Sequence, residues 1–344
     1  MRFSRRSLLI GGGALATATV AGGFGDALVL RPKSLAQATF IPVTATPIDR
    51  LSVSDPDRTR FGSLLFRSGL ELKSSLSGFG GFSALWRSPS GQHLVAVADH
   101  AHWLRARVET AEGRLSGLAD TVLTPLVLDS GKPLAKSRFF DTESLAVAGR
   151  TAFIGAERSQ DIIRFDWDRA GIPARGRPIP VPEEIKDLPY NRGLEAMGIA
   201  PPRSPLAGAL VAIAERDGRG GDTPTKGFIL TGRHPGTFHV ARSDAYEIAD
   251  LAFLPDGDLL LLDRRFSLIG GFGIRLRRVA GQAVRPGALV DGAAIFESDA
   301  SQQIDNMEGL AVHREGRDVV LTLISDDNFS PFQRTLLLEF TLVA

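Results

Sequence analysis

The chain is a succession of short apolar runs separated by turn residues. In five places a small or acidic residue opens a short apolar run, and these places begin 52 to 60 residues apart. No long stretch shows the 3.6-residue spacing of an amphipathic helix, so the runs are expected to be β-strands. The five runs are Ser83–Trp86, Glu143–Ala146, Glu195–Gly198, Asp250–Phe253 and Glu308–Ala311.

A second apolar run follows each of the first and ends in charged or polar residues. Turn sequences such as Ser88–Gly91 and Pro255–Gly257 lie between the two runs, which predicts a hairpin in each repeat. Repeats of this kind, each able to supply four strands, are typical of β-propeller blades. The second runs are Leu94–His100, Ala152–Arg158, Leu210–Arg216, Leu259–Arg264 and Val319–Asp327.

The expected fold is therefore an all-β propeller with five countable repeats. Residues 60–73 and 334–343 have the composition of further strands, which would close the ring between the N-terminal and C-terminal parts of the chain. A sixth, degenerate blade is an alternative count, and a two-sheet sandwich is the rival architecture.

Hairpin geometry is expected to gather the charged residues. In an antiparallel hairpin the first strand begins at the edge where the second strand ends. If the first strand of each repeat is the innermost one, these charges form a ring around one mouth of the central channel. The expected neighbours are Glu143 with Glu157 and Arg158, Glu195 with Glu215 and Arg216, Asp250 with Asp263 and Arg264, and Glu308 with Asp326 and Asp327.

Crowded carboxylates need compensation, because two unit charges 4 Å apart repel by about 4 kcal/mol at an effective dielectric constant of 20. The chain has no cysteine, so the available ligands are oxygen atoms, which favour a hard cation, Ca²⁺ ahead of Mg²⁺. Arginines beside such a cation suit an anionic small-molecule substrate. The alternative interpretation is that the Glu-Arg and Asp-Arg sequences form salt bridges that only stabilise the ring.

Other candidate chemistry is sparse. His100 and His102 form a His-x-His pair at the predicted rim of the first repeat, where His100 is a candidate general acid or ligand. The chain contains no Gly-x-Ser-x-Gly sequence, so a serine-esterase mechanism has no motif to support it.

The N-terminus has the features of an export signal. Arg5 and Arg6 precede a Gly/Ala-rich apolar stretch, and Ala36 and Ala38 offer a cleavage site, which predicts a twin-arginine signal peptide over residues 1–38. Residues 39–344 are then the propeller domain, in the periplasm or secreted. The formal net charge is +1 without a basic block, which argues against a nucleic-acid partner. No other apolar run is long enough to cross a bilayer.

The charged stretches resemble those of the phytase-like family, also described as "esterase-like activity of phytase". Their order and spacing over residues 60–344 are more specific than any single piece. The stretches are Asp141–Ala146, Gly155–Arg158, Asn191–Ala196, Leu254–Gly257, Asp263–Phe266, Asp305–Ala311, Ile324–Ser330 and Gln333–Leu338.

The resemblance implies a β-propeller, a hydrolase and a set of site residues. The ring of charged strand ends adds Arg216 to this set. The implied metal ligands are Glu143, Glu157, Glu195, Asp305, Glu308, Asp326 and Asp327. The residues expected to bind substrate are Arg158, Arg216, Arg264, Asn191 and Asn328. The residues expected to act in catalysis are Glu143, Arg158, Glu195, Arg264 and Glu308.

The expected function is an exported, metal-dependent hydrolase that acts on a phosphoester or another anionic ester. Two alternatives remain open at this point. One is a non-catalytic periplasmic propeller that binds an anionic ligand or an envelope protein. The other is a metal-dependent lactonase or carboxylesterase.

Overall fold

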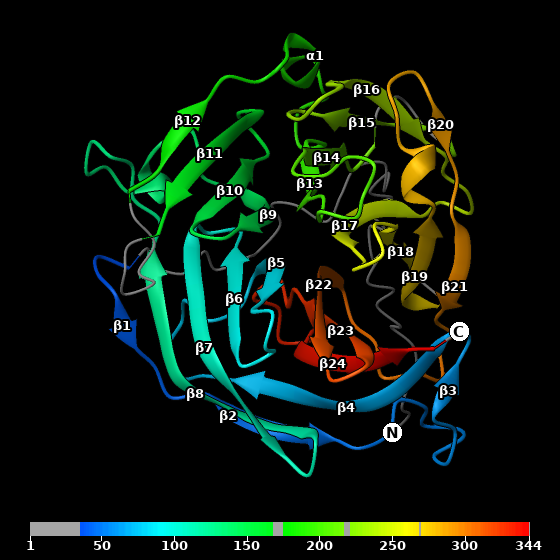
Figure 1. Cartoon of the computed structure of the whole chain (residues 1–344). Coiled ribbons are helices and arrows are strands. Elements are labelled where there is room, and N and C mark those ends of the chain that lie inside the picture. Colours follow the sequence, from blue (N-terminus) through cyan, green and yellow to red (C-terminus); the bar gives the residue numbers. More distant parts are fainter. Residues whose placement is uncertain (1–34, 168–174, 217–220, 268–269, 344) are drawn as a thin grey trace, which may run out of the picture. The chain divides into compact units, whose positions relative to one another are not determined.

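The turn-bounded apolar runs form five sheets, arranged as blades around a common axis in the part of the chain that the structure describes (Figure 1). This computed structural model describes residues 35–167, 175–216, 221–267 and 270–343. The five-blade, all-β propeller predicted from the sequence is confirmed, and the described residues form neither a sixth blade nor a two-sheet sandwich. Most of the predicted signal peptide lies outside the described residues.

Each blade is a mainly antiparallel sheet. Its strands follow one another along the chain from the inner strand, beside the axis, outwards, and strands from other parts of the chain are added at the outer edge of some blades. The first blade contains β5 (Phe82–Arg87), β6 (His93–Ala98), β7 (His102–Ala111), β8 (Arg114–Pro125) and the outer β1 (Thr39–Phe40). The second contains β9 (Thr142–Ala148), β10 (Thr151–Ala156), β11 (Asp161–Asp166) and β12 (Arg177–Ile179). The third contains β13 (Leu194–Ile199), β14 (Leu210–Ala214), β15 (Thr225–Ile229), β16 (Gly236–Val240) and β20 (Leu289–Val290), which pairs in parallel with β16.

The last two blades and the short helices complete the fold. The fourth blade contains β17 (Glu247–Phe253), β18 (Leu259–Ser267), β19 (Gly271–Val279) and β21 (Ala293–Glu297). The fifth contains β22 (Met307–Glu315), β23 (Asp318–Ser325), β24 (Thr335–Leu342), β4 (Leu64–Lys73) and β2 (Thr44–Ile48), with β3 (Arg60–Phe61) paired to β4. The helical turns are α1 (Glu183–Lys186), Leu134–Lys136 and Gly281–Ala283. No helix of the described residues is long and apolar enough to cross a membrane.

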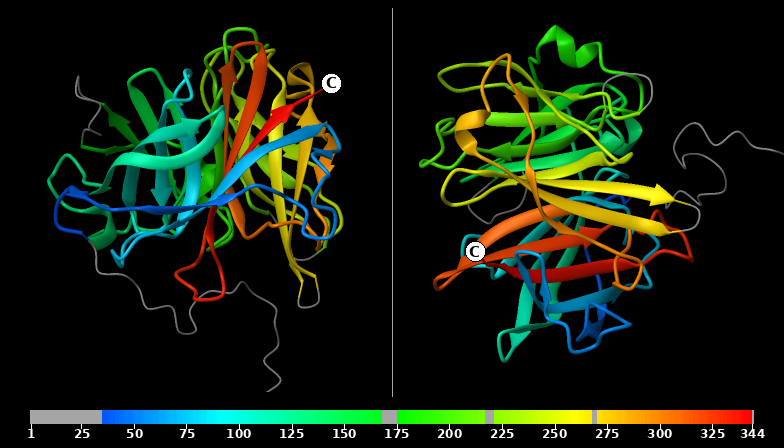
Figure 2. Two further views of the ribbon diagram at one scale, coloured as in Figure 1. Left: turned by 90° about the horizontal axis from the view of Figure 1, so that it is seen from below. Right: turned by 90° about the vertical axis from the view of Figure 1, so that its right-hand side faces the viewer.

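The fifth blade joins the two ends of the propeller. β4 pairs antiparallel with β24, from Leu72 opposite Thr335 to Leu64 opposite Leu342. The two strands lie side by side in every view (Figures 1 and 2). The sequence predicted strands over residues 60–73 and 334–343 that close the ring, and the structure confirms this closure.

The second strand of a blade is apolar on both faces because each blade is packed between two others. All five residues of β14 are buried, and five of the six in β6, so these strands are continuous apolar runs rather than alternating ones. β5, β9, β13, β17 and β22 surround the axis (Figure 1), and neighbouring inner strands are in contact.

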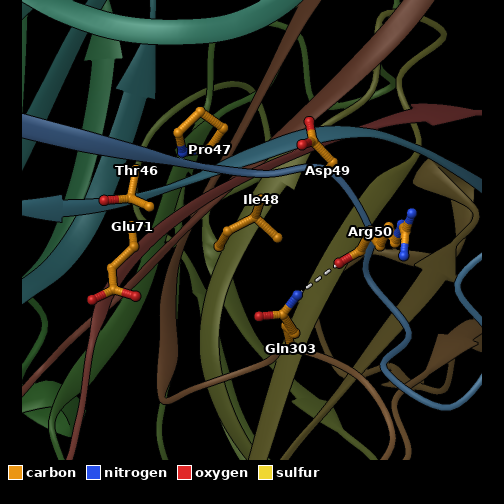
Figure 3. Close-up of a pocket in the computed structure, with 7 residues that line it drawn as sticks. All are labelled: Thr46, Pro47, Ile48, Asp49, Arg50, Glu71 and Gln303. Atoms are coloured by element: carbon orange, nitrogen blue, oxygen red, sulfur yellow. Dashed lines mark hydrogen bonds between the residues drawn. The ribbon is translucent and has the colours of Figure 1, made fainter.

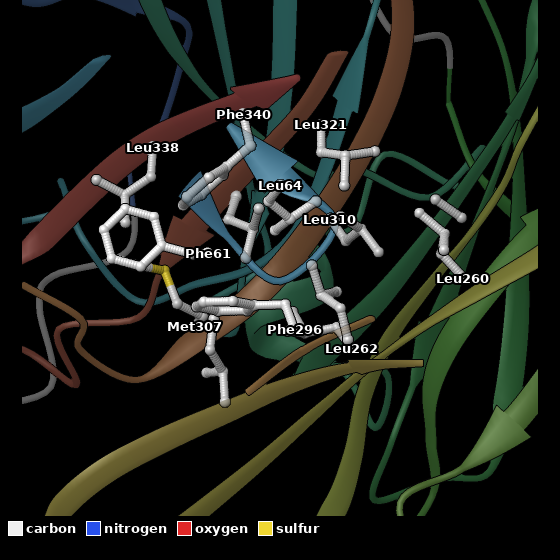
Figure 4. Close-up of a cluster of buried hydrophobic side chains, with 14 of the residues drawn as sticks. Phe61, Leu64, Leu260, Leu262, Phe296, Met307, Leu310, Leu321, Leu338 and Phe340 are labelled. Atoms are coloured by element: carbon white, nitrogen blue, oxygen red, sulfur yellow. The ribbon is translucent and has the colours of Figure 1, made fainter. Parts of the chain in front are cut away.

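The packing between the fourth and fifth blades illustrates what stabilises the ring. Leu260 and Leu262 of β18 share one cluster with Leu310 of β22 and Leu321 of β23, and Phe340 of β24 belongs to it as well (Figure 4). Each such side chain stabilises the fold by about 1.5–3 kcal/mol when it is fully buried. The apolar contacts between blades therefore fix the orientation of each blade around the axis. They also fix the positions of the charged residues at the strand ends.

Candidate functional site

A β-bulge interrupts the inner strand of every blade at the same point. In each blade the pairing of the inner strand with its neighbour skips one residue, for example Glu195 between Leu194 and Ala196. In a regular strand, side chains alternate between the two faces of the sheet. A bulge breaks this alternation and turns the side chain of the extra residue in a new direction. We call the five skipped residues the bulge ring: Ser83, Glu143, Glu195, Ala249 and Glu308.

A second ring of charges lies on the second strand of each blade, or just after it, beside the bulge of the inner strand. In the second blade Thr142 pairs with Ala156, so Glu157 is the first residue beyond this last pair. In each blade the equivalent residue comes directly after the partner of the residue that precedes the bulge, and four of the five are acidic. That of the fourth blade, Arg264, is still paired with Glu247. We call the five residues the strand-end ring: Asp99, Glu157, Glu215, Arg264 and Asp326.

Two carboxylates that the sequence pattern placed in a single ring of charges, Asp250 and Asp263, belong to neither the bulge ring nor the strand-end ring. Asp250 follows the bulge by one residue, and its Oδ2 accepts a hydrogen bond from the Leu310 amide at 2.7 Å. Asp263 lies one residue before the strand-end position and pairs with Arg275 and Arg277 at 2.9 and 2.6 Å. A slip of one residue turns a side chain to the opposite face of a strand, so the predicted Asp250–Asp263 neighbourhood is wrong.

Carboxylates gather at the second and third blades, and three of them have no ion-pair partner among the described residues. Oxygen atoms of Asp141, Glu143 and Glu157 lie within 4.8 Å of one another, and so do oxygen atoms of Glu157, Glu195 and Glu215. Among the described residues no ion pair within 4.0 Å is found for Glu143, Glu157 or Glu195. The predicted approach of Glu143 to Glu157, and of Glu195 to Glu215, is therefore present.

The pKa values of these carboxyl groups reflect burial and mutual repulsion. Burial, followed by the charges of Asp141 and Glu157, raises the pKa of Glu143 well above its usual value. Burial and then the charges of Glu157 and Glu143 do the same to the pKa of Glu195. Burial, with the charge of Glu247, raises the pKa of Glu215 to about 7. Without a bound cation, the cluster reduces the repulsion between its carboxylates by binding protons.

Arg264 is the single cation of the strand-end ring. Its Nη1 lies 2.8 Å from Glu308 and 3.0 Å from Asn306 Oδ1, and its Nη2 lies 3.5 Å from Glu215. Burial lowers the pKa of Arg264, but the surrounding carboxylates, Glu308 first, outweigh this effect and raise it above its ordinary value. Arg264 therefore remains charged.

Three other arginines lie beside the carboxylate cluster. Arg158 pairs with Asp141, Arg192 with Glu215 at 2.6 Å, and Arg216 with Glu247 at 2.9 Å. Each of these ion pairs is made through one nitrogen of the guanidinium group. The sequence analysis named Arg158 and Arg216 as substrate-binding residues, and the structure adds Arg192 to the same neighbourhood.

An exposed aromatic ring accompanies Arg158. Its guanidinium carbon lies 5.8 Å from the ring centre of Tyr190, which is 70% exposed, and 5.1 Å from that of Phe140. Asn191 follows Tyr190 and is half-buried, with a φ of 58° in the loop before β13. This predicted substrate-binding residue thus lies in the loop that also carries Arg192.

The predicted ligands of the fifth blade are largely occupied by backbone amides. Asp305 accepts from the amides of Asn306 and Arg334 at 2.9 and 3.1 Å. Asp327 accepts from the amides of Gly81 and Phe329 and from the Thr335 hydroxyl. These two carboxylates thus organise the loop after β23 and its contact with the first blade.

Two further predicted residues lie in that loop. Asp326 belongs to the strand-end ring, and its Oδ1 accepts from the Asn328 amide at 2.7 Å. Burial, followed by the charge of Glu308, raises the pKa of Asp326 well above its usual value. Asn328 therefore contacts the strand-end ring through its backbone amide. Its φ is 47°.

The two histidines are separated. His100 contacts Asp99 of the strand-end ring and packs edge-on to Phe329, with 4.7 Å between ring centres. His102 is fully buried, and its Nε2 accepts a hydrogen bond from the Leu35 amide at 3.2 Å. The predicted placement of His102 at the rim is therefore wrong, because β7 carries its side chain into the first blade.

The sequence analysis did not place Asp141, Arg192, Glu215 or Glu247 among the site residues. Glu215 was expected beside Glu195 but was not chosen as a ligand. The signal for Asp141 and Arg192 was present, since both lie within the charged stretches that contain Glu143 and Glu195. Nothing in the sequence pattern marks Glu247, which enters the site through its pairing with Arg264 across β17 and β18.

A hollow of about 380 Å³ lies apart from these rings (Figure 3). It is open to solvent and formed by β2, the following Asp49 and Arg50, Glu71 of β4, and Gln303, whose side chain donates to the Arg50 carbonyl at 2.8 Å. It contains no residue of the bulge ring or the strand-end ring.

The sequence matches the model of one known family over most of its length. The sequence model of the phytase-like family, esterase-like activity of phytase, matches residues 77–329. A search of curated proteins found no match.

Among solved structures, PQQ-bound aldose sugar dehydrogenase from Streptomyces coelicolor is similar, with 12% identity, a TM-score of 0.41 and coverage of 88% of this chain and 99% of that chain. The β-propeller domain of Cps50 (Swd1) from Myceliophteria thermophila has 12% identity and a TM-score of 0.34, covering 72% of this chain and 67% of that chain. Similarities at this level carry no argument about function.

Proposed function

The chain belongs to the phytase-like family, esterase-like activity of phytase, and from this premise we propose that it is a Ca²⁺-dependent hydrolase of phosphoesters. Membership supports a hydrolase-like function. The finer assignments of cation, substrate and residues are our proposal.

One observation carries the proposal: carboxylates from two adjacent blades converge without cationic partners. Glu143 and Glu195 are re-aimed by their bulges, and Glu157 lies between them with oxygen atoms within 4.8 Å of each group. Three negative charges at such distances are stable only with protons or with a cation among them. A site kept for structural reasons alone would be expected to include arginine partners, as Glu215 and Glu308 do.

The donor set fits calcium. All candidate ligands are carboxylate oxygens, and Ca²⁺ accepts several such ligands in irregular arrangements, whereas Mg²⁺ requires a nearly ideal octahedron. Glu143, Glu157 and Glu195 would hold the ion, with Asp141 at the outer side of the group. A calcium ion there supplies Lewis-acid polarisation of a bound phosphoryl oxygen.

The arginines around the cluster supply recognition of an anion. Arg158, Arg192 and Arg216 are each anchored by one carboxylate, which fixes the guanidinium group and leaves further N–H donors for a ligand. In Arg158, Nη1 also donates to the Tyr190 hydroxyl at 3.5 Å. They lie at the second and third blades, beside the carboxylates that would hold the ion. This arrangement favours a substrate with a phosphate group over a neutral ester.

Metal analysis of the purified mature protein tests the cation. We expect stoichiometric Ca²⁺ after dialysis and a higher melting temperature with Ca²⁺ than with EDTA, while Mg²⁺ has a smaller effect. Glu195→Gln should weaken Ca²⁺ binding by about 10-fold or more. Glu112→Gln, at an exposed turn, is the matched control and should bind as the wild type does. A melt that is the same with Ca²⁺ and with EDTA would refute the calcium site.

A substrate panel tests the reaction. Phosphomonoesters, phosphodiesters, lactones and neutral carboxylic esters are compared under the same Ca²⁺ concentration. Hydrolysis of phosphoesters that EDTA abolishes is the expected result. Hydrolysis of lactones alone would favour the lactonase alternative. Stabilisation by phosphate compounds without turnover would favour the non-catalytic propeller that binds an anionic ligand.

Export is proposed from the sequence. The twin arginine at Arg5 and Arg6 supports passage through the twin-arginine route, with cleavage after Ala38. Replacement of both arginines by lysine should retain the precursor in the cytoplasm, which fractionation and N-terminal sequencing measure. Unchanged periplasmic processing of that variant would contradict the proposal.

A further inference from the structure

The fourth blade differs from the other four at the strand-end position, and like the first blade it has no carboxylate at the bulge position. Where the bulge ring has a glutamate in three blades, the fourth has Ala249, whose side chain ends at its β-carbon. Where the strand-end ring has a carboxylate in four blades, the fourth has Arg264. The same blade therefore lacks an inward carboxylate and supplies the only cation of the two rings.

Arg264 reaches both neighbouring blades. Its Nη1 contacts Glu308 of the fifth blade at 2.8 Å, and its Nη2 approaches Glu215 of the third at 3.5 Å. Asn306 supports this contact, because its Oδ1 accepts from Arg264 and its Nδ2 donates to Glu308. Arg264 thus bridges two carboxylates that belong to different blades and different rings.

The opposite side of the rings has three carboxylates of the same kind that form no ion pair with an arginine among the described residues. Glu143 and Glu157 of the second blade meet Glu195 of the third in the cluster proposed above to hold Ca²⁺. The two sides differ in how closely an arginine approaches. Arg264 pairs directly with Glu308 at 2.8 Å, whereas no ion pair within 4.0 Å is found for Glu143, Glu157 or Glu195 among the described residues. The charges of Arg192 and Arg264 reach Glu157 and Glu195 only from a greater distance.

We propose that Arg264 is a resident counter-ion, a positioning residue that takes the place of a second divalent cation between Glu215 and Glu308. It would confine Ca²⁺ to the cluster at the second and third blades, and it would not be a substrate-binding group. This inference rests on the calcium site proposed above. A guanidinium has a fixed single charge and donates rather than coordinates, so it holds the blades permanently where an exchangeable ion would not.

The donors of Arg264 support this assignment over substrate binding. Nη1 and Nη2 are directed to protein oxygens, and Nε is buried without a hydrogen-bond partner among the described residues. Arg158, Arg192 and Arg216 each make their ion pair at a single nitrogen, which leaves them better placed to meet an anion.

Calcium stoichiometry of the mature protein tests the proposal. Arg264→Gln should bind one more Ca²⁺ per chain than the wild type, measured by metal analysis after dialysis and by calorimetric titration with Ca²⁺ alone. Arg264→Lys retains a cation and should bind as many ions as the wild type. A stoichiometry for Arg264→Gln equal to that of the wild type would overturn the proposal.

If Arg264→Gln does not fold, a second pair of variants tests the counter-ion role of Arg264. Glu308 is already neutralised by Arg264, so Glu308→Gln should reduce Ca²⁺ affinity much less than Glu195→Gln, which should weaken it by about 10-fold or more. Equal losses in the two variants would contradict the role of Arg264.

The two proposals fail separately. If the wild type binds no Ca²⁺ but Arg264→Gln gains one ion, the calcium-dependent function is refuted and the counter-ion role stands. If the wild type binds Ca²⁺ and Arg264→Gln gains none, the function stands and the counter-ion role is refuted.

Discussion

Asp250 in the inner strand of the fourth blade accepts a hydrogen bond from the Leu310 amide in the inner strand of the fifth, at 2.7 Å. Its other oxygen accepts from the Leu251 amide at the same distance. Burial raises the pKa of Asp250 well above its usual value, although both amide donors oppose this effect. This carboxyl group therefore joins two blades near the axis.

Asp250→Ala should destabilise the protein by about 1–3 kcal/mol, because the buried Leu310 amide loses its acceptor. Urea unfolding followed by circular dichroism measures the change. Asp57→Ala, at an exposed position, should change the free energy of unfolding by no more than about 0.5 kcal/mol. Equal stability of the two variants would show that the bond between the blades contributes little.

The pKa of Glu215 predicts how stability without cations depends on pH. Its usual value of 4.5 is raised to about 7 in the folded protein, so between these values the folded state holds more protons than the unfolded state. The contribution of Glu215 to the free energy of unfolding in EDTA should therefore fall as pH rises from about 4.5 to about 7, by up to about 1.4 kcal/mol per pH unit.

Comparison with Glu215→Gln isolates this contribution. The difference in unfolding free energy between wild type and variant should change with pH in that window and be constant above it. Because Ca²⁺ competes with protons for the carboxylates, its affinity for the wild type should rise over the same range. A difference curve that is flat from pH 4.5 to 7 would contradict the raised pKa.

His102 predicts the opposite slope at acid pH. Burial, followed by the charge of His100, lowers the pKa of His102 to about 4 from 6.5, so the unfolded state binds more protons between these values. The contribution of His102 to the free energy of unfolding should therefore fall as pH decreases from 6.5 to 4. His102→Gln, which does not titrate, should reduce this fall, while the exposed His93→Gln should leave it unchanged.

Arg158→Ala should raise the KM for a phosphoester by about 10-fold or more, because a charge-assisted hydrogen bond to the substrate is lost. The exposed Arg203→Ala is the control for loss of one positive charge. Steady-state kinetics on the best phosphoester from the panel provide the measurement. An unchanged KM would show that the anion binds elsewhere.

The sequence pattern predicted the hairpins and their charged ends better than it predicted the ring positions. Leu94–His100 and Ala152–Arg158 were identified because strands buried on both faces are continuous apolar runs. The outer strands, such as Arg177–Ile179, are short and partly exposed, and they leave no such signal.

The bulges explain why some ring residues were assigned one position away. In the fourth blade the skipped residue is Ala249, so counting a charged residue before each apolar run selected Asp250 instead. A bulge is a feature of pairing between strands, and a single strand sequence does not reveal it. The counter-ion Arg264 was named, but its two partners come from the third and fifth blades, which only the folded ring brings together.

The closure of the fifth blade sets an order of events during synthesis. β24 is made last, and it separates β23 from β4, which is made first among the long strands. From the time β4 leaves the ribosome until residue 342 follows it, one edge of β4 has no partner, and an open edge invites pairing with other chains. Arg67, Glu71 and Lys73 lie along β4, where charges discourage such pairing. The propeller can thus close only after residue 342 has been made, and until then the charges along β4 protect its open edge.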